Sequence, residues 1–501
     1  MTRVPLQTYI FAEKIVRRKK TKPFYGQVMI TGIGSEGKSL AKVGDKVVFT
    51  DHAIPGDVVD LQVTVSKKRY EEARVVRYHA YSPDRTDPFC RHFGLCGGCK
   101  WQFLPYQLQL SYKQQQVQDQ LERIGKIELP PMLPILGSEE TRFYRNKLEF
   151  SFSDNRWLTK DELDTGEPVS SRDALGFHVP GMFDKIFQVD ECWLQPEPSN
   201  KIRNFLYDYA TREGLEFYNI KNRGGFLRSL IIRTSATGGV MVILSFFRED
   251  RDTREKLLKR LTEEFPEITS LFYVINPKGN DTITDLEPLL FHGDDHITEE
   301  MEGLRFRIGP KSFFQTNSWQ AQHLYQKVRE LAGLRGDELV YDLYCGTGTI
   351  ALFLARACLR VTGLEYVAEA TEDARINARN NGIENVSFIA GDIRDLLNPS
   401  LLEKEGRPSV IITDPPRAGM HGDVVAAIVE AAPAKVVYVS CNPATQARDL
   451  ALMNDHYRVE TIQPVDMFPH THHVENIVLL VRREDHRAGL TPEAPEADQF
   501  Q

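Results

Sequence analysis

The chain has 501 residues, of which 41% are hydrophobic, and its formal net charge is −8. This length predicts roughly three domains with buried cores. No run approaches the ~18 apolar residues of a membrane-spanning helix, and the N-terminus lacks the apolar segment of a signal peptide. We therefore expect a cytoplasmic protein with no membrane partner. Seven cysteines in so long a chain exclude a secreted disulfide framework and favour metal binding or chemistry.

The front of the chain is basic although the whole chain is acidic. Residues 1–85 carry sixteen Lys and Arg against nine Asp and Glu, a net charge of +7, so the remainder carries −15. The basic run from Arg17 to Lys22 can be a solvated arm. Residues 24–81 then alternate apolar and polar positions between Gly, Pro and Asp, which predicts short strands in a small β-barrel of the oligonucleotide-binding type. Ahead of such a module, the basic run predicts contacts with nucleic-acid phosphates.

A cysteine cluster follows the barrel. Cys90, Cys96 and Cys99 are spaced C-x5-C-x2-C, and Cys192 lies far downstream. Four thiolates suit either tetrahedral zinc or a [4Fe-4S] cluster, and the three-plus-one arrangement favours iron and sulfur. If all four are ligands, no iron is open for radical chemistry, so we expect a structural or RNA-facing cluster. His92 could replace a thiol on zinc, but we interpret it as a lone surface histidine.

A mixed α+β domain is expected up to about Gly309. Apolar residues recur at helical spacing from Leu104 to Ile124, and this helix is expected to pack on the catalytic domain. Residues 227–247 predict a hairpin, residues 252–265 a helix, and the polar residues 155–172 a loop insertion. The acidic, proline-containing tail after Arg483 is expected to be disordered.

From Lys311 the chain alternates strands and helices, which is typical of a doubly wound parallel sheet. Gly346-x-Gly348-x-x-Ala351 follows the first strand, and Glu365 ends the second at the place where ribose hydroxyls bind in nucleotide sheets. Asp392 follows the third strand, where an adenine-edge acceptor is expected. Asp414 follows the fourth in a DPPR turn that has no role in hydride transfer. The combination favours S-adenosylmethionine over a nicotinamide.

Residues 436–445, VVYVSCNPAT, carry Cys441 at the end of an apolar strand. Such a thiol can be a buried core residue or a nucleophile. Glu475 stands just before the last strand, after His470, His472 and His473, which we interpret as loop residues or RNA contacts rather than metal ligands.

These residues resemble the bacterial RNA uracil-5-methyltransferase family, in particular its cluster-containing branch that makes 5-methyluridine in 23S ribosomal RNA. The resemblance is carried by the C-x5-C-x2-C cluster and by SFFQTN, DLYCGTGT, TDPPRAG, SCNPAT and PHTHHVEN. It implies a Rossmann-like S-adenosylmethionine-dependent methyltransferase domain behind a TRAM/OB-like barrel and a central α+β domain with a [4Fe-4S] cluster, zinc being the alternative. The implied domains are residues 1–85, 86–310, 311–483 and a tail, 484–501.

The resemblance also implies a role for each site residue. Cys441 is the nucleophile and Glu475 the general base. Cofactor and substrate residues are Gln315, Tyr344, Gly346, Gly348, Glu365, Asp392 and Asp414, and the cluster ligands are Cys90, Cys96, Cys99 and Cys192.

The chemistry of uracil explains these roles. A Cys441 thiolate adds to C6 so that C5 can attack the methyl sulfonium, and Glu475 then removes the C5 proton. We expect the pKa of Cys441 to be lowered for this purpose, and the target base to be flipped out of its stack. The substrate is expected to be 23S rRNA, with tRNA as the alternative, and the protein to be a monomer without an obligate protein partner. Competing hypotheses are an iron-sulfur oxidoreductase using a nicotinamide or flavin, and an RNA-binding protein with an inactive catalytic domain.

Overall fold

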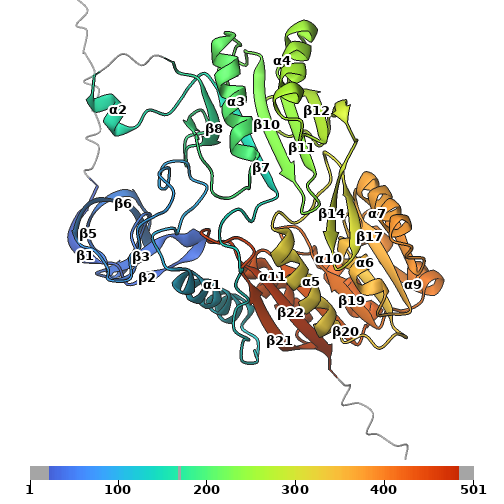
Figure 1. Cartoon of the computed structure of the whole chain (residues 1–501). Coiled ribbons are helices and arrows are strands. Elements are labelled where there is room, and N and C mark those ends of the chain that lie inside the picture. Colours follow the sequence, from blue (N-terminus) through green and yellow to red (C-terminus); the bar gives the residue numbers. More distant parts are fainter. Residues whose placement is uncertain (1–21, 167–170, 484–501) are drawn as a thin grey trace, which may run out of the picture. The chain divides into compact units, whose positions relative to one another are not determined.

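The computed structural model describes residues 22–166 and 171–483 (Figure 1). The chain divides into two compact units, Met1–Arg85 and Thr86–Gln501. The predicted boundary near residue 310 falls inside the second unit, which contains two large sheets. The predicted contacts of Arg17 to Lys20 and the predicted disorder after Arg483 lie outside the described residues.

The first unit is a six-stranded sheet in the order β1-β5-β6-β4-β3-β2. Alternate residues of its strands point inward, and Val48, Val59 and Leu61 are fully buried in its core. The prediction of short strands in this region is confirmed. The strands are β1 (Phe24–Met29), β2 (Gly32–Ile33), β3 (Ser39–Val43), β4 (Lys46–Thr50), β5 (Val58–Ser66) and β6 (Tyr70–Ala80), with a 3-10 turn at Ser35–Gly37.

The first sheet of the second unit has seven strands in the order β13-β12-β11-β10-β7-β8-β9. β10 and β11 form the predicted hairpin, and every residue of both is buried. The expectation of a plain loop over residues 155–172 is wrong, since α2 (Lys160–Asp164) is a short helix there. The other elements are β7 (Lys147–Ser153), β8 (Ala174–His178), β9 (Ile186–Gln188), α3 (Ser199–Arg212), β10 (Leu227–Thr234), β11 (Val240–Phe246), α4 (Arg251–Glu264), β12 (Ser270–Ile275) and β13 (Leu289–Gly293).

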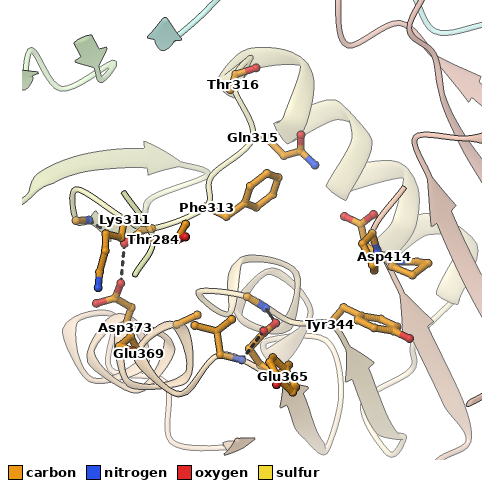
Figure 2. Close-up of a pocket in the computed structure, with 18 of the residues that line it drawn as sticks. Thr284, Lys311, Phe313, Gln315, Thr316, Tyr344, Glu365, Glu369, Asp373 and Asp414 are labelled. Atoms are coloured by element: carbon orange, nitrogen blue, oxygen red, sulfur yellow. Dashed lines mark hydrogen bonds between the residues drawn. The ribbon is translucent and has the colours of Figure 1, made fainter. Parts of the chain in front are cut away.

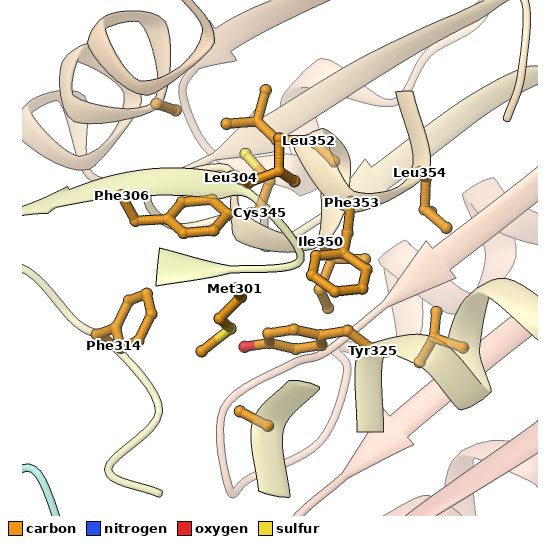
Figure 3. Packing of buried hydrophobic residues seen from close by; sticks show 14 of the residues in the cluster. Met301, Leu304, Phe306, Phe314, Tyr325, Cys345, Ile350, Leu352, Phe353 and Leu354 are labelled. Carbon is orange, nitrogen blue, oxygen red and sulfur yellow. The ribbon is translucent and has the colours of Figure 1, made fainter. Parts of the chain in front are cut away.

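A two-stranded hairpin joins this sheet to the next. β14 (Ile297–Met301) and β15 (Leu304–Ile308) pair antiparallel. Met301, Leu304 and Phe306 pack with Ile350 and other apolar residues of the following domain in one core cluster, as Figure 3 shows. This continuous core explains why the two sheets form a single compact unit.

The second large sheet has the order β18-β17-β16-β19-β20-β22-β21. All its neighbouring pairs are parallel except the two that involve β22. From β16 the chain builds outward in one direction through β17 and β18 and then returns to place β19 on the other side. The crevice between β16 and β19 is therefore the topological switch point at which such sheets bind ligands. The strands are β16 (Leu339–Leu343), β17 (Arg360–Glu365), β18 (Val386–Ala390), β19 (Val410–Thr413), β20 (Lys435–Ser440), β21 (Tyr457–Val465) and β22 (Glu475–Arg482).

Helices cover both faces of this sheet. One face packs against α5 (Ser318–Ala332), α6 (Thr349–Ala355) and α7 (Ala368–Asn380). Side chains of α8 (Ile393–Leu396), α9 (Pro399–Glu405), α10 (Gly422–Ala431) and α11 (Pro443–Met453) pack on the other, together with Val117 of α1 (Tyr106–Gln120) and the π-helical turn Leu121–Gly125.

Two helix starts follow from local chemistry. Asn317 caps α5 by accepting a hydrogen bond from the Gln320 amide. Helix α1 begins at Tyr106 rather than Leu104, because Pro105 occupies the cap position with an extended ψ of 142°. None of the helices within the described ranges is both long and apolar enough to cross a membrane.

Candidate active site

A cavity of about 1270 Å³ opens at the carboxyl ends of β16 and β19, at the switch point of the sheet. Figure 2 shows its cofactor side, where Gln315, Tyr344, Glu365 and Asp414 lie around one space. Pockets for a single drug-sized ligand are about 300–1,000 Å³, so this cavity has room for two reactants. Its lining includes the predicted residues Gln315, Tyr344, Gly346, Glu365, Asp392, Asp414, Cys441 and Glu475.

The turn after β16 is held open by backbone geometry and by Glu365. Tyr344 has φ 64° and Gly346 has φ 54°, and a positive φ on a residue as bulky as tyrosine is strained. The Glu365 carboxylate accepts hydrogen bonds from the Gly346 amide (2.9 Å) and the Val367 amide (2.8 Å). Gly348 lies outside the lining residues, and an added Cβ there would stand 2.9 Å from Ala374. Glycine at position 348 therefore allows this turn to pack closely against Ala374 of α7.

Asp392 combines two roles at the start of α8. It caps the helix by accepting a hydrogen bond from the Arg394 amide, and its carboxylate pairs with the Arg394 guanidinium. These contacts lower the pKa of Asp392 to about 2. An adenine edge would meet a fully ionised acceptor, already oriented by its arginine.

The register of β20 and β22 brings the two predicted catalytic residues together. Ser440 pairs with Asn476 in this antiparallel ladder. The next position along each strand holds Cys441 on one and Glu475 on the other, so they are neighbours at the same edge of the sheet. The turn that carries Cys441 is tied to the DPPR turn, since the Asn442 side chain donates to the Arg417 carbonyl (3.1 Å).

The electrostatics of this edge contradict one expectation. The pKa of Cys441 is raised to about 12 rather than lowered, first by burial and then by Glu475 and Asp414, while Arg417 opposes the rise. Burial raises the pKa of Asp414 to about 7. Burial and the charge of Asp414 raise the pKa of Glu475, whose exposed fraction is 4%, to about 8. The resting site therefore holds a protonated thiol beside two carboxyl groups that titrate close to neutral pH.

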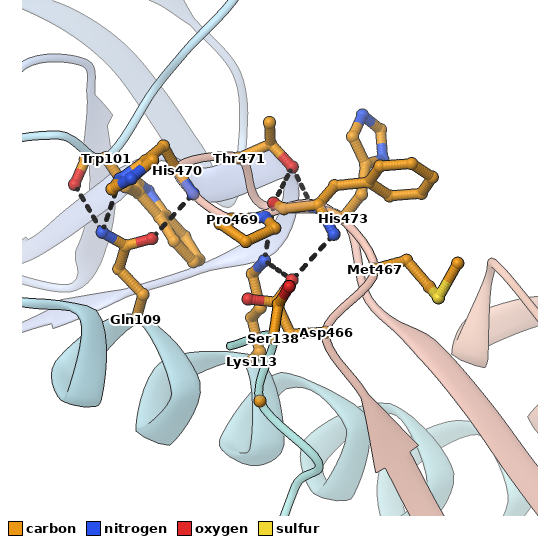
Figure 4. Close-up of polar contacts among 12 residues, drawn as sticks. Trp101, Gln109, Lys113, Ser138, Asp466, Met467, Pro469, His470, Thr471 and His473 are labelled. Carbon is orange, nitrogen blue, oxygen red and sulfur yellow. Dashed lines mark hydrogen bonds and ion pairs between the residues drawn. The ribbon is translucent and has the colours of Figure 1, made fainter. Parts of the chain in front are cut away.

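The loop before Glu475 is anchored by α1 (Figure 4). The Lys113 ammonium donates to the Asp466 carboxylate (2.6 Å) and to the Phe468 carbonyl (3.0 Å), and both charged side chains are fully buried. Tyr106 donates a further hydrogen bond to Asp466 (2.9 Å). Phe468 and His473 line the cavity, so this buried ion pair lies directly behind the cavity wall.

Sequence reasoning missed Lys113, although a signal was present. Lys113, Val117 and Leu121 are spaced four residues apart and so share one helix face. Both apolar members of this series are buried in the core. A lysine on the apolar face of a helix requires a buried counter-charge, which the chain supplies more than 350 residues later.

The three histidines are neutral at pH 7. Burial lowers the pKa of His470 and His473 to about 4 and that of His472 to about 3. The His470 carbonyl accepts hydrogen bonds from the amides of Lys100 (2.8 Å) and Trp101 (3.1 Å). These hydrogen bonds join the segment just after Cys99 to the loop before β22.

The four cysteines of the predicted cluster line one small internal cavity. Cys192 is buried, and burial raises the pKa of Cys96 to about 11 and that of Cys99 to about 12. His92 is buried rather than at the surface as expected, and its ring contacts the Glu191 carbonyl (3.2 Å). Within residues 22–166 and 171–483, no three His, Cys, Asp or Glu side chains are gathered closely enough to hold a metal ion.

Two sequence families match parts of the chain. The family described as tRNA (Uracil-5-)-methyltransferase matches residues 293–483, which contain β14, β15 and the whole second sheet. The TRAM domain family matches residues 26–76, within the first unit.

Relatives match almost the whole chain. An uncharacterized RNA methyltransferase of Bacteroides thetaiotaomicron is 57% identical over 454 residues, which cover 90% of this chain and 100% of the relative. One of Porphyromonas gingivalis is 55% identical over 463 residues, covering 91% of this chain and 100% of the relative. Among solved structures, the tRNA (uracil-54, C5)-methyltransferase of Pyrococcus abyssi in complex with S-adenosyl-L-homocysteine aligns with a TM-score of 0.70 at 28% identity, covering 91% of this chain and 100% of that chain.

Proposed function

Since the chain belongs to the RNA uracil-5-methyltransferase family, we propose that it methylates C5 of a specific uridine in 23S ribosomal RNA. Family membership also excludes the nicotinamide or flavin oxidoreductase hypothesis. The observation that carries the proposal is the pairing of Ser440 with Asn476. It makes Cys441 and Glu475 neighbours at the edge of a cavity large enough for a methyl donor and a flipped nucleotide.

Cys441 starts the reaction because uracil C5 is a poor nucleophile. Its sulfur bonds to C6, and the electron pair of the C5–C6 double bond moves toward O4 to give an enolate. Because burial keeps the resting thiol protonated, its proton must pass to a base as the sulfur–carbon bond forms, and we assign that role to the Asp414 carboxylate, whose pKa is about 7. C5 then bonds to the electrophilic methyl carbon that the sulfonium of S-adenosylmethionine supplies, as the bond from that carbon to sulfur breaks and S-adenosyl-L-homocysteine is left as the thioether product.

Glu475 ends the reaction. Once C5 carries both a methyl group and a proton, a base must take that proton so that the double bond reforms and the Cys441 sulfur leaves. A carboxyl group with a pKa of about 8 is a stronger base than an ordinary glutamate and still titrates near the working pH. The buried position of Glu475 excludes water from competing for the same proton.

The cofactor residues fit a methyl donor bound across the switch point. Glu365 has lone pairs left after its two backbone hydrogen bonds and is assigned to the ribose hydroxyls. Asp392 is assigned to the adenine edge, and Gln315 and Tyr344 to the reacting end beside Asp414. The Pyrococcus abyssi enzyme was solved in complex with S-adenosyl-L-homocysteine, which supports S-adenosylmethionine as the methyl donor.

A [4Fe-4S] cluster is the proposed occupant of the small cavity lined by Cys90, Cys96, Cys99 and Cys192. The donor set fits, because four thiols face one cavity and iron-sulfur clusters are held by four cysteines. Zinc, which four thiolates can also hold, is the alternative occupant. The role of the cluster is structural, since each iron would already have a cysteine ligand.

The substrate RNA is tested by methylation of defined transcripts. Unmodified 23S rRNA and unmodified tRNA are incubated with the purified protein and methyl-labelled S-adenosylmethionine, and the product nucleotide is mapped by mass spectrometry. Label in 5-methyluridine of 23S rRNA is the expected result. Label in tRNA alone would move the substrate to tRNA, as in the Pyrococcus abyssi enzyme. Failure on both RNAs would overturn the proposal and favour an inactive RNA-binding protein.

A further inference from the structure

Residues 142–146 connect an exposed aromatic cluster to the reaction cavity. Asn146 donates to the Gln315 carbonyl (2.9 Å), and Arg145 lines the cavity. Tyr144 donates to the Pro469 carbonyl (2.9 Å) in the loop before Glu475. Phe143 and Arg142, one and two positions before Tyr144, are exposed. An extended chain advances about 3.3 Å per residue, so Phe143 is within about one nucleotide of the cavity wall.

Phe143 belongs to an aromatic cluster with a cation on it. Its ring lies 5.5 Å from that of Trp193, which in turn lies 5.8 Å from Phe89. The Arg142 guanidinium stands 4.0 Å from the centre of the Phe89 ring and 5.4 Å from that of Trp193. Phe89 also contacts the His470 ring at 5.0 Å. This cluster therefore continues directly into the catalytic loop.

The backbone of Phe143 is strained in the conformation that exposes its ring. Phe143 has φ 56° and is 44% exposed. A bulky non-glycine residue with positive φ costs about 1–3 kcal/mol, and such residues concentrate at functional sites. The strain is held by the Phe143 amide, which donates to the Trp193 carbonyl (2.7 Å). Burial does not explain the conformation, since nearly half of the side chain faces water.

The nearby arginines are not neutralised by the protein. Arg142 and Arg145 form no salt bridge within the described ranges, and the Arg145 Nε–H is buried without a hydrogen-bond partner. Aromatic faces interleaved with uncompensated arginines are the recognition surface for unstacked nucleotides and their phosphates. An acidic peptide would form ion pairs with the arginines but would not stack on the aromatic rings.

We propose that Arg142, Phe143 and Trp193 form a stacking platform for an unpaired nucleotide of the substrate RNA next to the flipped uridine. This inference rests on the proposed function, because flipping the target base leaves its neighbours without a stacking partner. The Phe143 ring stacks on the exposed face of the neighbouring base. Arg142 stands over the rings to meet a phosphate of the same strand.

Equilibrium binding tests the platform without requiring methyl transfer. The probe is a fluorescein-labelled single-stranded uridine-rich 12-mer RNA, followed by anisotropy. Phe143→Gly is expected to weaken binding by about five- to hundredfold, the range found for loss of one stacked base. Because glycine tolerates a positive φ, the same variant should keep or raise the melting temperature. Phe143→Tyr should bind within about threefold of the wild type.

Two further variants define the chemistry. Arg142→Ala should weaken binding and reduce the slope of log K against log salt by about 1, as expected for one lost phosphate contact. Phe183→Ala removes another exposed phenylalanine of the second unit and should bind the probe like the wild type.

Several outcomes would overturn the platform. The first is an equal affinity of the wild type and Phe143→Gly for the probe RNA. The second is a loss of affinity in Phe183→Ala as large as that in Phe143→Gly. The third is an unchanged KM for RNA in Phe143→Gly. A wild type that binds the probe through Phe143 but methylates no RNA would instead refute the proposed function and leave the platform standing.

Discussion

Replacing Glu475 with glutamine should stabilise the protein at alkaline pH while removing its activity. Glu475 is 4% exposed and its pKa is raised to about 8 by burial and by Asp414. In the unfolded chain the same carboxyl group ionises near its ordinary value of 4.5. Between these two pH values the folded state binds more protons than the unfolded state, so stability falls as pH rises. Glutamine does not titrate and is free of this cost.

The size of the effect follows from the two pKa values. A rise from 4.5 to about 8 corresponds to about 5 kcal/mol above pH 8, at about 1.4 kcal/mol per pKa unit. Relaxation around the charge reduces this, so about 2–5 kcal/mol is expected. For a unit of this size, about 2 °C per kcal/mol gives an apparent Tm gain of about 4–10 °C at pH 8.5. At pH 5 the gain should fall below about 1 kcal/mol, because Glu475 is then neutral in the folded state and this pH lies only slightly above the unfolded pKa of 4.5.

The assay is thermal unfolding of the wild type, Glu475→Gln and Glu300→Gln at pH 5 and pH 8.5. Glu300 is exposed on β14 and serves as the matched control, with no pH-dependent gain expected. In the wild type, kcat should rise with pH through about 8, because the base must be ionised to accept the C5 proton. Glu475→Gln should instead accumulate a covalent RNA adduct, visible as a band shift. An equal Tm difference at both pH values, or a lower Tm of Glu475→Gln at pH 8.5, would refute the reasoning.

Three further predictions concern the remaining site residues. Alkylation of Cys441 by iodoacetamide should be slow at pH 7, and its rate should rise steadily toward pH 10. Asp414→Asn should accelerate the alkylation at pH 8, because it removes a negative charge near the thiol. An alkylation rate that is already maximal at pH 7 would show that the pKa of Cys441 is lowered instead. Lys113→Met should lower the free energy of unfolding by about 3–5 kcal/mol, because it leaves the Asp466 carboxylate buried without a counter-charge. The same variant should reduce kcat more than it raises KM. A free energy of unfolding equal to that of the wild type would mean that Asp466 becomes neutral without cost. Cys99→Ser should lose bound iron and visible absorption while Cys358→Ser keeps both, and stoichiometric zinc without iron in the wild type would refute the cluster.

The sequence located most cavity residues because of a property of parallel sheets. Strands that run the same way end at the same edge, so Glu365 and Asp414, which follow apolar runs, had to come close together. The same logic placed Cys441 at this edge. It could not give the pKa of Cys441, which depends on burial and on carboxylates that come close only in the folded chain. Burial is the main cause of the rise, and Asp414 and Glu475, which is 34 positions away in the sequence, add to it.

Other details were beyond local patterns for a different reason. The buried pair of Lys113 and Asp466 joins residues 353 positions apart, so the position of Lys113 on an apolar helix face indicates a buried charge but not the residue that pairs with it. Helix α2 lies in a polar segment whose composition predicted a loop. A local sequence pattern indicates whether nearby residues are buried on average. It cannot identify the distant residue that pairs with a buried charge.

The reversed direction of β22 is what brings the proposed base to the edge of the sheet that carries the proposed nucleophile. A parallel strand brings its last residue to the cofactor edge, as β20 does with Ser440 and then Cys441. A residue that precedes a parallel strand would lie at the opposite edge, so Glu475 could not reach the nucleophile from such a strand. β22 runs antiparallel between β20 and β21, so its first residue, Glu475, arrives where β20 ends. The loop anchored by Lys113 returns the chain to that edge, so the strands of the proposed nucleophile and the proposed base reach one cavity from opposite directions.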